Sequence, residues 1–158
     1  MMILSQLLSG KVISMVSPLR RDLVLRLPKR TRDQLVYLKR KTKVKHYHVL
    51  CRWAFCLSVQ DDRPPRDSIA SSSEDFEIQL GTFGQSYAEI YWDLGRQKVI
   101  AENLDVTEDN IRHSIELHIQ RGMARMGGPG GIRSISDLVQ FAIPHGGKDA
   151  PELSDPKS

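Results

Sequence analysis

The chain has 158 residues and a mass of 17.9 kDa, which is the size of one domain. With 40% hydrophobic and 27% charged residues it has the composition of a globular protein and not of a disordered one. No apolar run is long enough to cross a membrane, and no basic residue precedes the apolar start, as a secretory signal would require. We therefore expect one globular domain, and the two cysteines, which do not make a disulfide framework, favour a reducing, cytoplasmic setting.

The net charge of +4 conceals a strong asymmetry along the chain. Residues 20–58 carry twelve Lys or Arg against two Asp, a local net charge of +10. Residues 59–158 carry ten basic and seventeen acidic residues, a net charge of −7. A basic segment inside an otherwise acidic chain indicates contact with a polyanion. A well-solvated basic helix face is the structural alternative, and composition alone does not decide between them.

Residues 1–19 are expected to form an extension that precedes the main pattern. Residues 22–27 then alternate between apolar and polar side chains, which predicts a short strand with Leu23, Leu25 and Leu27 on its buried face. Pro28 ends this strand and suits the first turn of a helix. The spacing that follows predicts a basic helix over 29–41, a turn over 42–45 and an apolar helix over 46–59. The expected inner face of the second helix comprises Val49, Leu50, Trp53, Ala54 and Leu57.

This order of strand, helix, turn and helix is typical of ribbon-helix-helix proteins, which dimerise by pairing their strands and place the ribbon in the major groove of DNA. An isolated strand leaves its backbone groups unpaired, so the strand over 22–27 is predicted to pair with its equivalent in a second copy. The alternative is that a second strand of the same chain, predicted over 76–80, closes the sheet.

The second half of the chain is predicted to continue with a loop over 61–73, a turn framed by Gly81 and Gly84, and a helix over 85–102 in which Gly95 is a weak point. Asp105 or Thr107 is expected to cap a long helix that runs to Met126. Glycines at 127–131 end it, a short helix follows over 135–141, and residues 144–158 form a polar tail. The expected inner face of the long helix comprises Ile111, Ile115, His118 or Ile119, Gly122 and Met126.

The fold prediction is therefore a mainly α, compact helical domain with a short N-terminal strand, ribbon-helix-helix-like and oligomeric. The predicted divisions are an extension over 1–19, a DNA-binding domain over 20–126, and a Gly/Pro-rich hinge with a short helix and polar tail over 127–158.

The sequence contains no recognisable catalytic or cofactor motif. The glycine-rich run follows a helix, so it is not a dinucleotide fingerprint, and no Gly-Lys pair has the spacing of a phosphate-binding loop. His46, His48, Cys51 and Cys56 form the candidate zinc set. Cys56 points away from the others on a helix, and no second cysteine pair completes a tetrahedron. We predict packed, structural cysteines without a disulfide, and neither a metal nor a cofactor.

Four segments strongly resemble the DndE family: Leu-Val-Tyr-Leu-Lys-Arg-Lys-Thr at 35–42, Val-Leu-Cys-Arg-Trp-Ala-Phe-Cys-Leu-Ser at 49–58, Gly-Thr-Phe-Gly at 81–84 and Leu-His-Ile-Gln-Arg-Gly at 117–122. The resemblance runs from about residue 21 to residue 126. DndE is the small subunit of the bacterial DNA phosphorothioation system, in which sulfur replaces a non-bridging oxygen of the DNA backbone. The resemblance implies a helical fold likened to ribbon-helix-helix proteins, oligomers reported as tetramers, and DNA binding through lysines.

Carried over by position, Lys39 matches the family's lysine in its first helix. Where the family often has Thr-Gly after the basic run, this chain has Thr42 followed by Lys43. The predicted function is a non-catalytic DNA-binding subunit that grips the backbone, including that of nicked duplex, beside other Dnd modification proteins and away from membranes. The alternatives are a DNA-nicking enzyme of the same system and a ribbon-helix-helix repressor. The predicted DNA-binding residues are Lys29, Arg30, Lys39, Arg40, Lys41, Lys43, Lys45, Arg52, His118 and Arg121.

Overall fold

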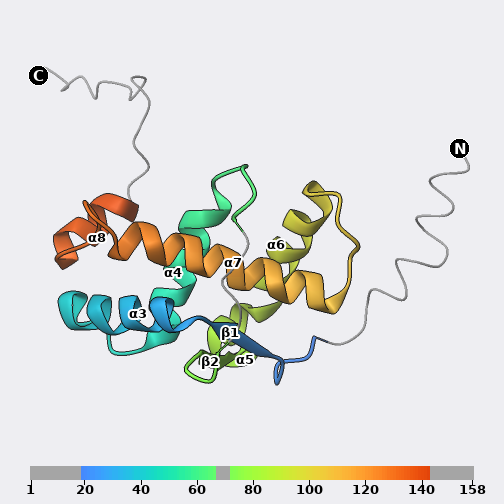
Figure 1. The fold of residues 1–158 in the computed structure, drawn as a ribbon, viewed down its shortest axis with the longest axis horizontal. Coiled ribbons are helices and arrows are strands. Elements are labelled where there is room, and N and C mark those ends of the chain that lie inside the picture. Colours follow the sequence, from blue (N-terminus) through green and yellow to red (C-terminus); the bar gives the residue numbers. More distant parts are fainter. Residues whose placement is uncertain (1–18, 67–71, 143–158) are drawn as a thin grey trace, which may run out of the picture.

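The computed structural model describes residues 19–66 and 72–142, and within them the predicted mainly helical fold is confirmed. The long helix α7 (Glu108–Gly127) runs through the middle of the molecule, where it packs against α3, α4, α6 and β1 (Figure 1). In chain order the other elements are β1 (Val24–Leu27), α3 (Lys29–Thr42), α4 (Tyr47–Val59), β2 (Phe76–Gln79), α5 (Leu80–Gly84), α6 (Ala88–Ala101) and α8 (Ile135–Ala142).

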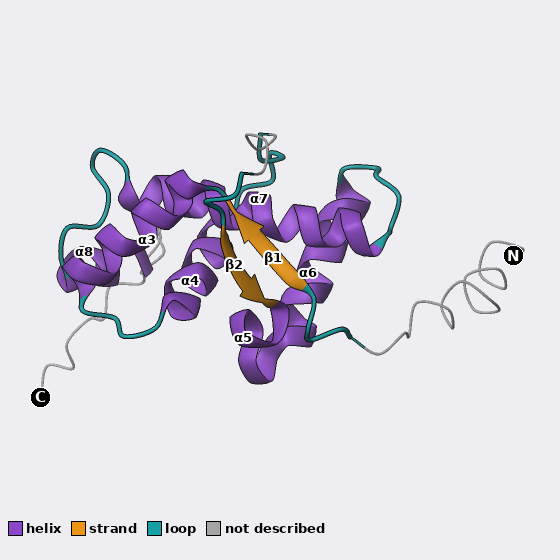
Figure 2. Ribbon diagram, turned by 60° about the horizontal axis from the view of Figure 1, so that its bottom comes forward, coloured by secondary structure: helices purple, strands orange, loops and turns teal. Residues whose placement is uncertain are grey.

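β1 and β2 form a two-stranded antiparallel sheet in which Leu25 lies opposite Ile78 (Figure 2). Leu25 and Leu27 are fully buried, as their alternation predicted. The predicted pairing of this strand with a second copy is wrong, because β2 of the same chain is its partner. On the other edge of β1, the Arg26 N–H donates a hydrogen bond of 2.8 Å to the Glu116 carboxylate of α7. Both edges of β1 are thus occupied within the chain.

The first two helices follow the prediction in extent, but α4 is rotated relative to it. α3 buries Leu35 and Leu38, whereas Trp53 of α4, predicted to be internal, is 38% exposed. α4 is apolar on almost every side, so its periodicity does not identify the buried face, and packing against α7 selects it. The residues that α4 buries are Leu50, Cys51, Ala54, Phe55 and Ser58.

Two glycines bring the helices close to α7. A Cβ atom on Gly122 would lie 1.8 Å from the Ala54 carbonyl oxygen, so α4 and α7 cross with their backbones in contact. A Cβ atom on Gly95 would lie 2.7 Å from Cγ1 of Ile115. Gly95, predicted as a weak point of its helix, therefore gives α6 room to pack against α7.

The segment between β2 and α6 differs from its prediction. The expected turn at Gly81 and Gly84 is the short helix α5, which ends where Gln85 adopts a positive φ of 51°. A 3-10 turn over Gln85–Tyr87 follows, so the helix predicted from residue 85 begins at Ala88.

The ends of α7 are as predicted. Of its two candidate caps, Thr107 is the one used, and its side chain accepts a hydrogen bond of 3.1 Å from the Asn110 N–H. The glycine run ends α7, and α8 follows as the predicted short helix. Ile132 is buried, so the core continues past residue 126.

Residues 1–18 and 143–158, which contain almost all of the predicted extension and the predicted tail, lie outside the described residues, as do residues 67–71. Within the described ranges, every helix is too short or too polar to span a lipid bilayer.

Candidate nucleic-acid interface

Five cationic side chains gather where α3 ends and the chain turns into α4. We call Lys39, Arg40, Lys41, Lys43 and Lys45 the lysine surface. Lys39 is half-buried and the other four are exposed. In the described ranges, none of the five forms an ion pair, whereas elsewhere Lys29 pairs with Glu74 at 2.8 Å and Arg26 with Glu77 at 3.3 Å. The lysine surface therefore presents uncompensated positive charge.

The backbone at this corner is fixed by hydrogen bonds. Lys43 adopts a left-handed conformation, with φ 62° and ψ 15°, and its N–H donates to the Lys39 carbonyl at 3.0 Å. The hydroxyl of the buried Thr42 donates to the Leu38 carbonyl at 2.8 Å. Cations in the last turn of a helix also interact favourably with its dipole, which contributes to the stability of this arrangement.

Aromatic side chains lie among these cations. The Lys39 ammonium lies 4.4 Å from the centre of the Tyr47 ring, and that of Lys41 lies 5.8 Å from the Tyr37 ring. The rings of His46 and His48 stack 5.2 Å apart. Burial, with the nearby charges of Arg52 and His46, lowers the pKa of His48, which favours its neutral form near neutral pH.

A shallow groove of about 390 Å³ separates part of the lysine surface from β2. Lys39 and Lys45 line it on one side, and Glu77 and Gln79 of β2 line it on the other. The lysine surface thus reaches the outer edge of the sheet.

The other predicted DNA-binding residues do not join this cluster. Lys29 is engaged by Glu74 at the other end of α3, and Arg52 is half-buried on α4. Arg30 lies in a separate groove together with Arg121. The sequence therefore predicted a compact surface from residues that are neighbours in the chain, and the more distant residues lie elsewhere.

His118, predicted both for the inner face of the long helix and as a DNA-binding residue, is fully buried, so its ring is not accessible to DNA in this fold. The Arg121 Nε–H donates to Ser58 Oγ at 2.7 Å, and Ser58 Oγ lies 2.9 Å from His118 Nδ1. The other ring nitrogen, Nε2, is buried and has no hydrogen-bond partner among the described residues. Desolvation, followed by the charge of Arg121, lowers the pKa of His118 to about 4, so the ring is neutral at pH 7.

Arg121 itself ties the loop after α4 to α7. Its guanidinium donates to the Ser58 carbonyl at 2.7 Å and to the Arg63 carbonyl at 2.6 Å. With most of its donors used in this way and 17% of its side chain exposed, Arg121 serves mainly to position the loop.

The cysteines are packed, as predicted. Both thiols are free, and Cys51 is fully buried while Cys56 is half-buried. Desolvation raises the pKa of Cys51 to about 12, so this thiol is protonated and unreactive. Across residues 19–66 and 72–142, no three His, Cys, Asp or Glu side chains come together in a way that could hold a metal ion.

Comparison with known proteins adds one finding to this geometry. No curated protein matches the chain. The family model described as DNA sulphur modification protein DndE matches residues 24–133, most of the chain and nearly all of the folded core. The matched region contains the lysine surface, the sheet and the buried contacts of α7. From this match, the chain belongs to the DndE family of DNA sulphur modification proteins.

Proposed function

We propose that this protein is the non-catalytic DNA-binding subunit of the DNA sulphur modification machinery, acting in the cytoplasm beside the proteins that insert sulfur. The observation that carries the proposal is the lysine surface, where five cationic groups without ion-pair partners among the described residues occupy one corner of the fold. A surface of this kind binds phosphates irrespective of base sequence.

The sheet supports backbone binding over sequence readout. A ribbon-helix-helix repressor reads bases from the exposed face of a strand pair. Here the exposed face carries Arg26 and Glu77, which pair with each other at 3.3 Å. With its charge balanced in this way, the sheet is poorly suited to enter a DNA groove, so we place the contact on α3 and the following turn.

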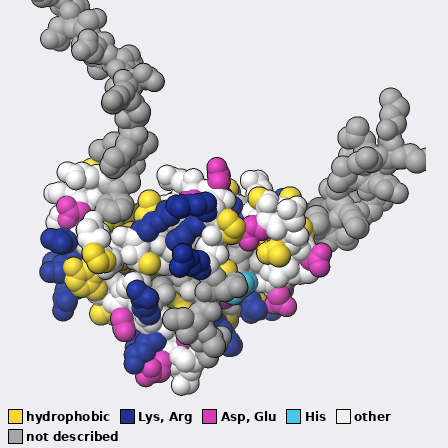
Figure 3. Space-filling model, turned by 45° about the horizontal axis from the view of Figure 1, so that its top comes forward, with side chains coloured by type: hydrophobic (Ala, Val, Ile, Leu, Met, Phe, Trp, Pro, Cys, Tyr) yellow, Lys and Arg dark blue, Asp and Glu magenta, His cyan; other side chains and the backbone are white. Residues whose placement is uncertain are grey.

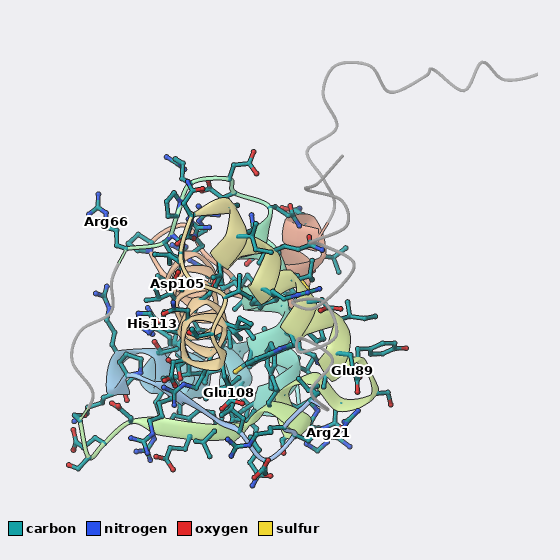
Figure 4. The ribbon with its side chains drawn as sticks, turned by 90° about the vertical axis from the view of Figure 1, so that its right-hand side faces the viewer. Arg21, Arg66, Glu89, Asp105, Glu108 and His113 are labelled. Atoms are coloured by element: carbon teal, nitrogen blue, oxygen red, sulfur yellow. The ribbon has the colours of Figure 1, made fainter. Side chains whose placement is uncertain are left out.

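The decisive experiment compares two double variants, each with two cationic side chains replaced by glutamine, in their binding to a duplex of about thirty base pairs. The Lys39→Gln/Lys41→Gln variant should lose affinity, and its salt dependence should fall by roughly two units, about 0.9 per phosphate contact. The control is Arg20→Gln/Arg21→Gln, because these exposed arginines pair with Glu108 and Glu89, in the first turns of α7 and α6, and not with the end of α3. Figure 4 shows Arg21 beside Glu89. Equal losses in both variants, or none in either, would refute the assignment of the surface.

The nicking alternative is tested separately. Purified protein incubated with supercoiled plasmid and Mg²⁺ should bind it without producing relaxed circles. Relaxation that increases with protein concentration and persists after repurification would instead establish an enzyme.

A further inference from the structure

A second basic region lies at the opposite end of α3. A groove of about 720 Å³ runs between the first turns of α3, the loop that follows α4, and α7. Five arginines line it against a single carboxylate, that of Asp61. We call Arg30, Arg63, Arg66, Arg121 and Arg125 the arginine groove. Figure 3 shows Lys and Arg side chains concentrated near the centre of one face of the molecule.

Asp61 organises this groove. Its carboxylate accepts hydrogen bonds from the guanidinium groups of Arg63, at 2.9 Å, and Arg125, and the Arg121 guanidinium lies 3.9 Å away. These hydrogen bonds hold the pKa of Asp61 well below its usual range. One carboxylate therefore fixes two guanidiniums, those of Arg63 and Arg125, and leaves the groove with a large positive excess. Fixed donors bind an anion with little loss of conformational entropy.

Two further arginines of the groove lie outside the hydrogen-bonded cluster around Asp61. Arg30 and Arg66 are exposed, and neither has a hydrogen-bond or ion-pair partner in the described part of the chain. Figure 4 shows Arg66 extending from the loop away from the body of the protein. The first turn of α3 contains no acidic residue, and Pro28 at its N-cap makes no side-chain hydrogen bond to it, so the positive end of the helix dipole adds to the charge of Arg30.

The lining of the groove indicates what it binds. A guanidinium presents a planar fork of donors that matches the oxygens of a phosphate. No aromatic side chain lines the groove within the described ranges, so it offers no platform on which a base could stack. The groove thus suits the phosphates of a nucleic-acid backbone and not the bases of a single strand.

The arginine groove and the lysine surface lie at opposite ends of the same helix, α3. Arg30 and Lys41 are eleven residues apart, which places them on the same face of α3 and roughly 16 Å apart along its axis. Duplex DNA carries one phosphate charge per ~1.7 Å of axis, so a segment of that length presents roughly nine charges. A single duplex is therefore long enough and charged enough to contact both ends of the helix.

We propose that the arginine groove is a second phosphodiester-binding site, which holds the same nucleic acid as the lysine surface through Arg30, Arg66 and the guanidiniums fixed by Asp61. This inference rests on the proposed function, since it assigns a second contact to the same ligand. Two contacts on one rigid helix strengthen each other, because binding at the first raises the effective concentration at the second.

The test compares the full chain with its Arg30→Gln/Arg66→Gln variant. The two arginines replaced have no hydrogen-bond or ion-pair partner among the described residues. We expect about tenfold weaker binding to a duplex of thirty base pairs and a salt slope lower by roughly two units. Thermal unfolding should be unchanged. The Arg20→Gln/Arg21→Gln variant, which removes the same charge elsewhere, should bind like the wild type.

The outcomes separate this inference from the proposed function. If the lysine variant loses affinity and the groove variant does not, the groove is not a nucleic-acid site and the proposed function stands. If neither variant loses affinity, the proposed function fails as well. If the groove variant binds duplex normally but no longer binds poly-glutamate, the groove takes an acidic polypeptide, and the inference is overturned.

Discussion

Lys43 occupies a backbone conformation that favours glycine. A side chain in the left-handed region costs about 1–2 kcal/mol, and glycine avoids that cost at the end of a helix. The φ of Lys43, 62°, lies in this left-handed region. This chain has a lysine there, so a cation is gained on the lysine surface at the expense of backbone strain.

Lys43→Gly should therefore change stability and DNA affinity in opposite directions. The free energy of unfolding should rise by about 1 kcal/mol because the strain is relieved. Affinity for duplex should fall, with a salt slope lower by roughly one unit. Denaturant unfolding and fluorescence anisotropy measure the two effects. Lys45→Gly is the control, because Lys45 is not in a left-handed conformation and its loss should bring no gain in stability.

His118 should make the fold sensitive to mild acid. Its pKa is about 4 in the folded protein and near 6.5 in an unfolded chain, so the unfolded state binds more protons between these values. The contribution of the neutral His118 ring to the free energy of unfolding is complete above pH 6.5 and is lost as the pH falls towards 4. The loss should amount to something on the order of 3 kcal/mol, and unfolding followed at several pH values will measure it.

The matched variant is His118→Asn, which does not titrate but keeps a polar group that can hydrogen-bond to Ser58. Burial raises the pKa of Glu116, so protonation of this carboxylate stabilises the fold as the pH falls, opposite to the effect of His118. Both proteins contain Glu116, so the difference between their pH profiles isolates the effect of His118. A ring pKa near 6.5 in the NMR titration of the folded protein would contradict the buried, neutral histidine.

At the scale of elements, the crossing of α4 and α7 should tolerate no side chain at Gly122. In Gly122→Ala the new Cβ atom would collide with the backbone of Ala54, which cannot move without displacing α4. We expect a loss of at least 1–3 kcal/mol in the free energy of unfolding, the usual cost of overpacking a core. Gly127→Ala is the control, because its Cβ atom would meet only the flexible Gln34 side chain, at 3.3 Å. A fully stable Gly122→Ala protein would show that the two helices are not in close contact.

Most of the helices could be predicted from the sequence because their boundaries are encoded locally. Pro28, Thr107 and the glycines after Met126 mark helix ends through their own backbone and side-chain chemistry. The partner of β1 could not be predicted in this way, because β2 lies beyond two helices and the sequence does not specify which strand it pairs with.

The same distinction between neighbouring and distant residues applies to the candidate site. The lysine surface could be predicted because its cations are close together in the sequence. The arginine groove could not, since Arg30, Arg63 and Arg125 come from α3, from the loop after α4 and from α7, which only the fold brings together. Nor could spacing show that Arg121 holds a loop, since its acceptors are backbone carbonyls.

For the whole molecule, we propose that the working form is a homo-oligomer, with a tetramer as the expected size. Tyr87, which directly precedes α6, and Ile90, in the first turn of α6, are three residues apart and are 59% and 56% exposed. Exposed apolar side chains at this spacing are typical of a surface that is covered in an assembly. Association of several copies would also multiply the positive field around the DNA.

Ile90→Asp should therefore give smaller particles in light scattering, with unchanged helix content and weaker binding to long duplex. Val139→Asp, which places the same charge on a residue 53% exposed on α8, is the control and should leave the particle size unaltered. Wild-type protein that sediments as a monomer at micromolar concentration and still binds DNA tightly would refute the assembly.

The central position of α7 also has a consequence for how the protein is made. The first strand to leave the ribosome is β1, yet its backbone partners are β2 and Glu116, which are synthesised much later. The nascent chain must therefore hold β1, α3 and α4 in an incomplete state until α7 emerges and covers their apolar faces. The lysine surface is synthesised early, but it reaches its final form only when the last large helix is in place.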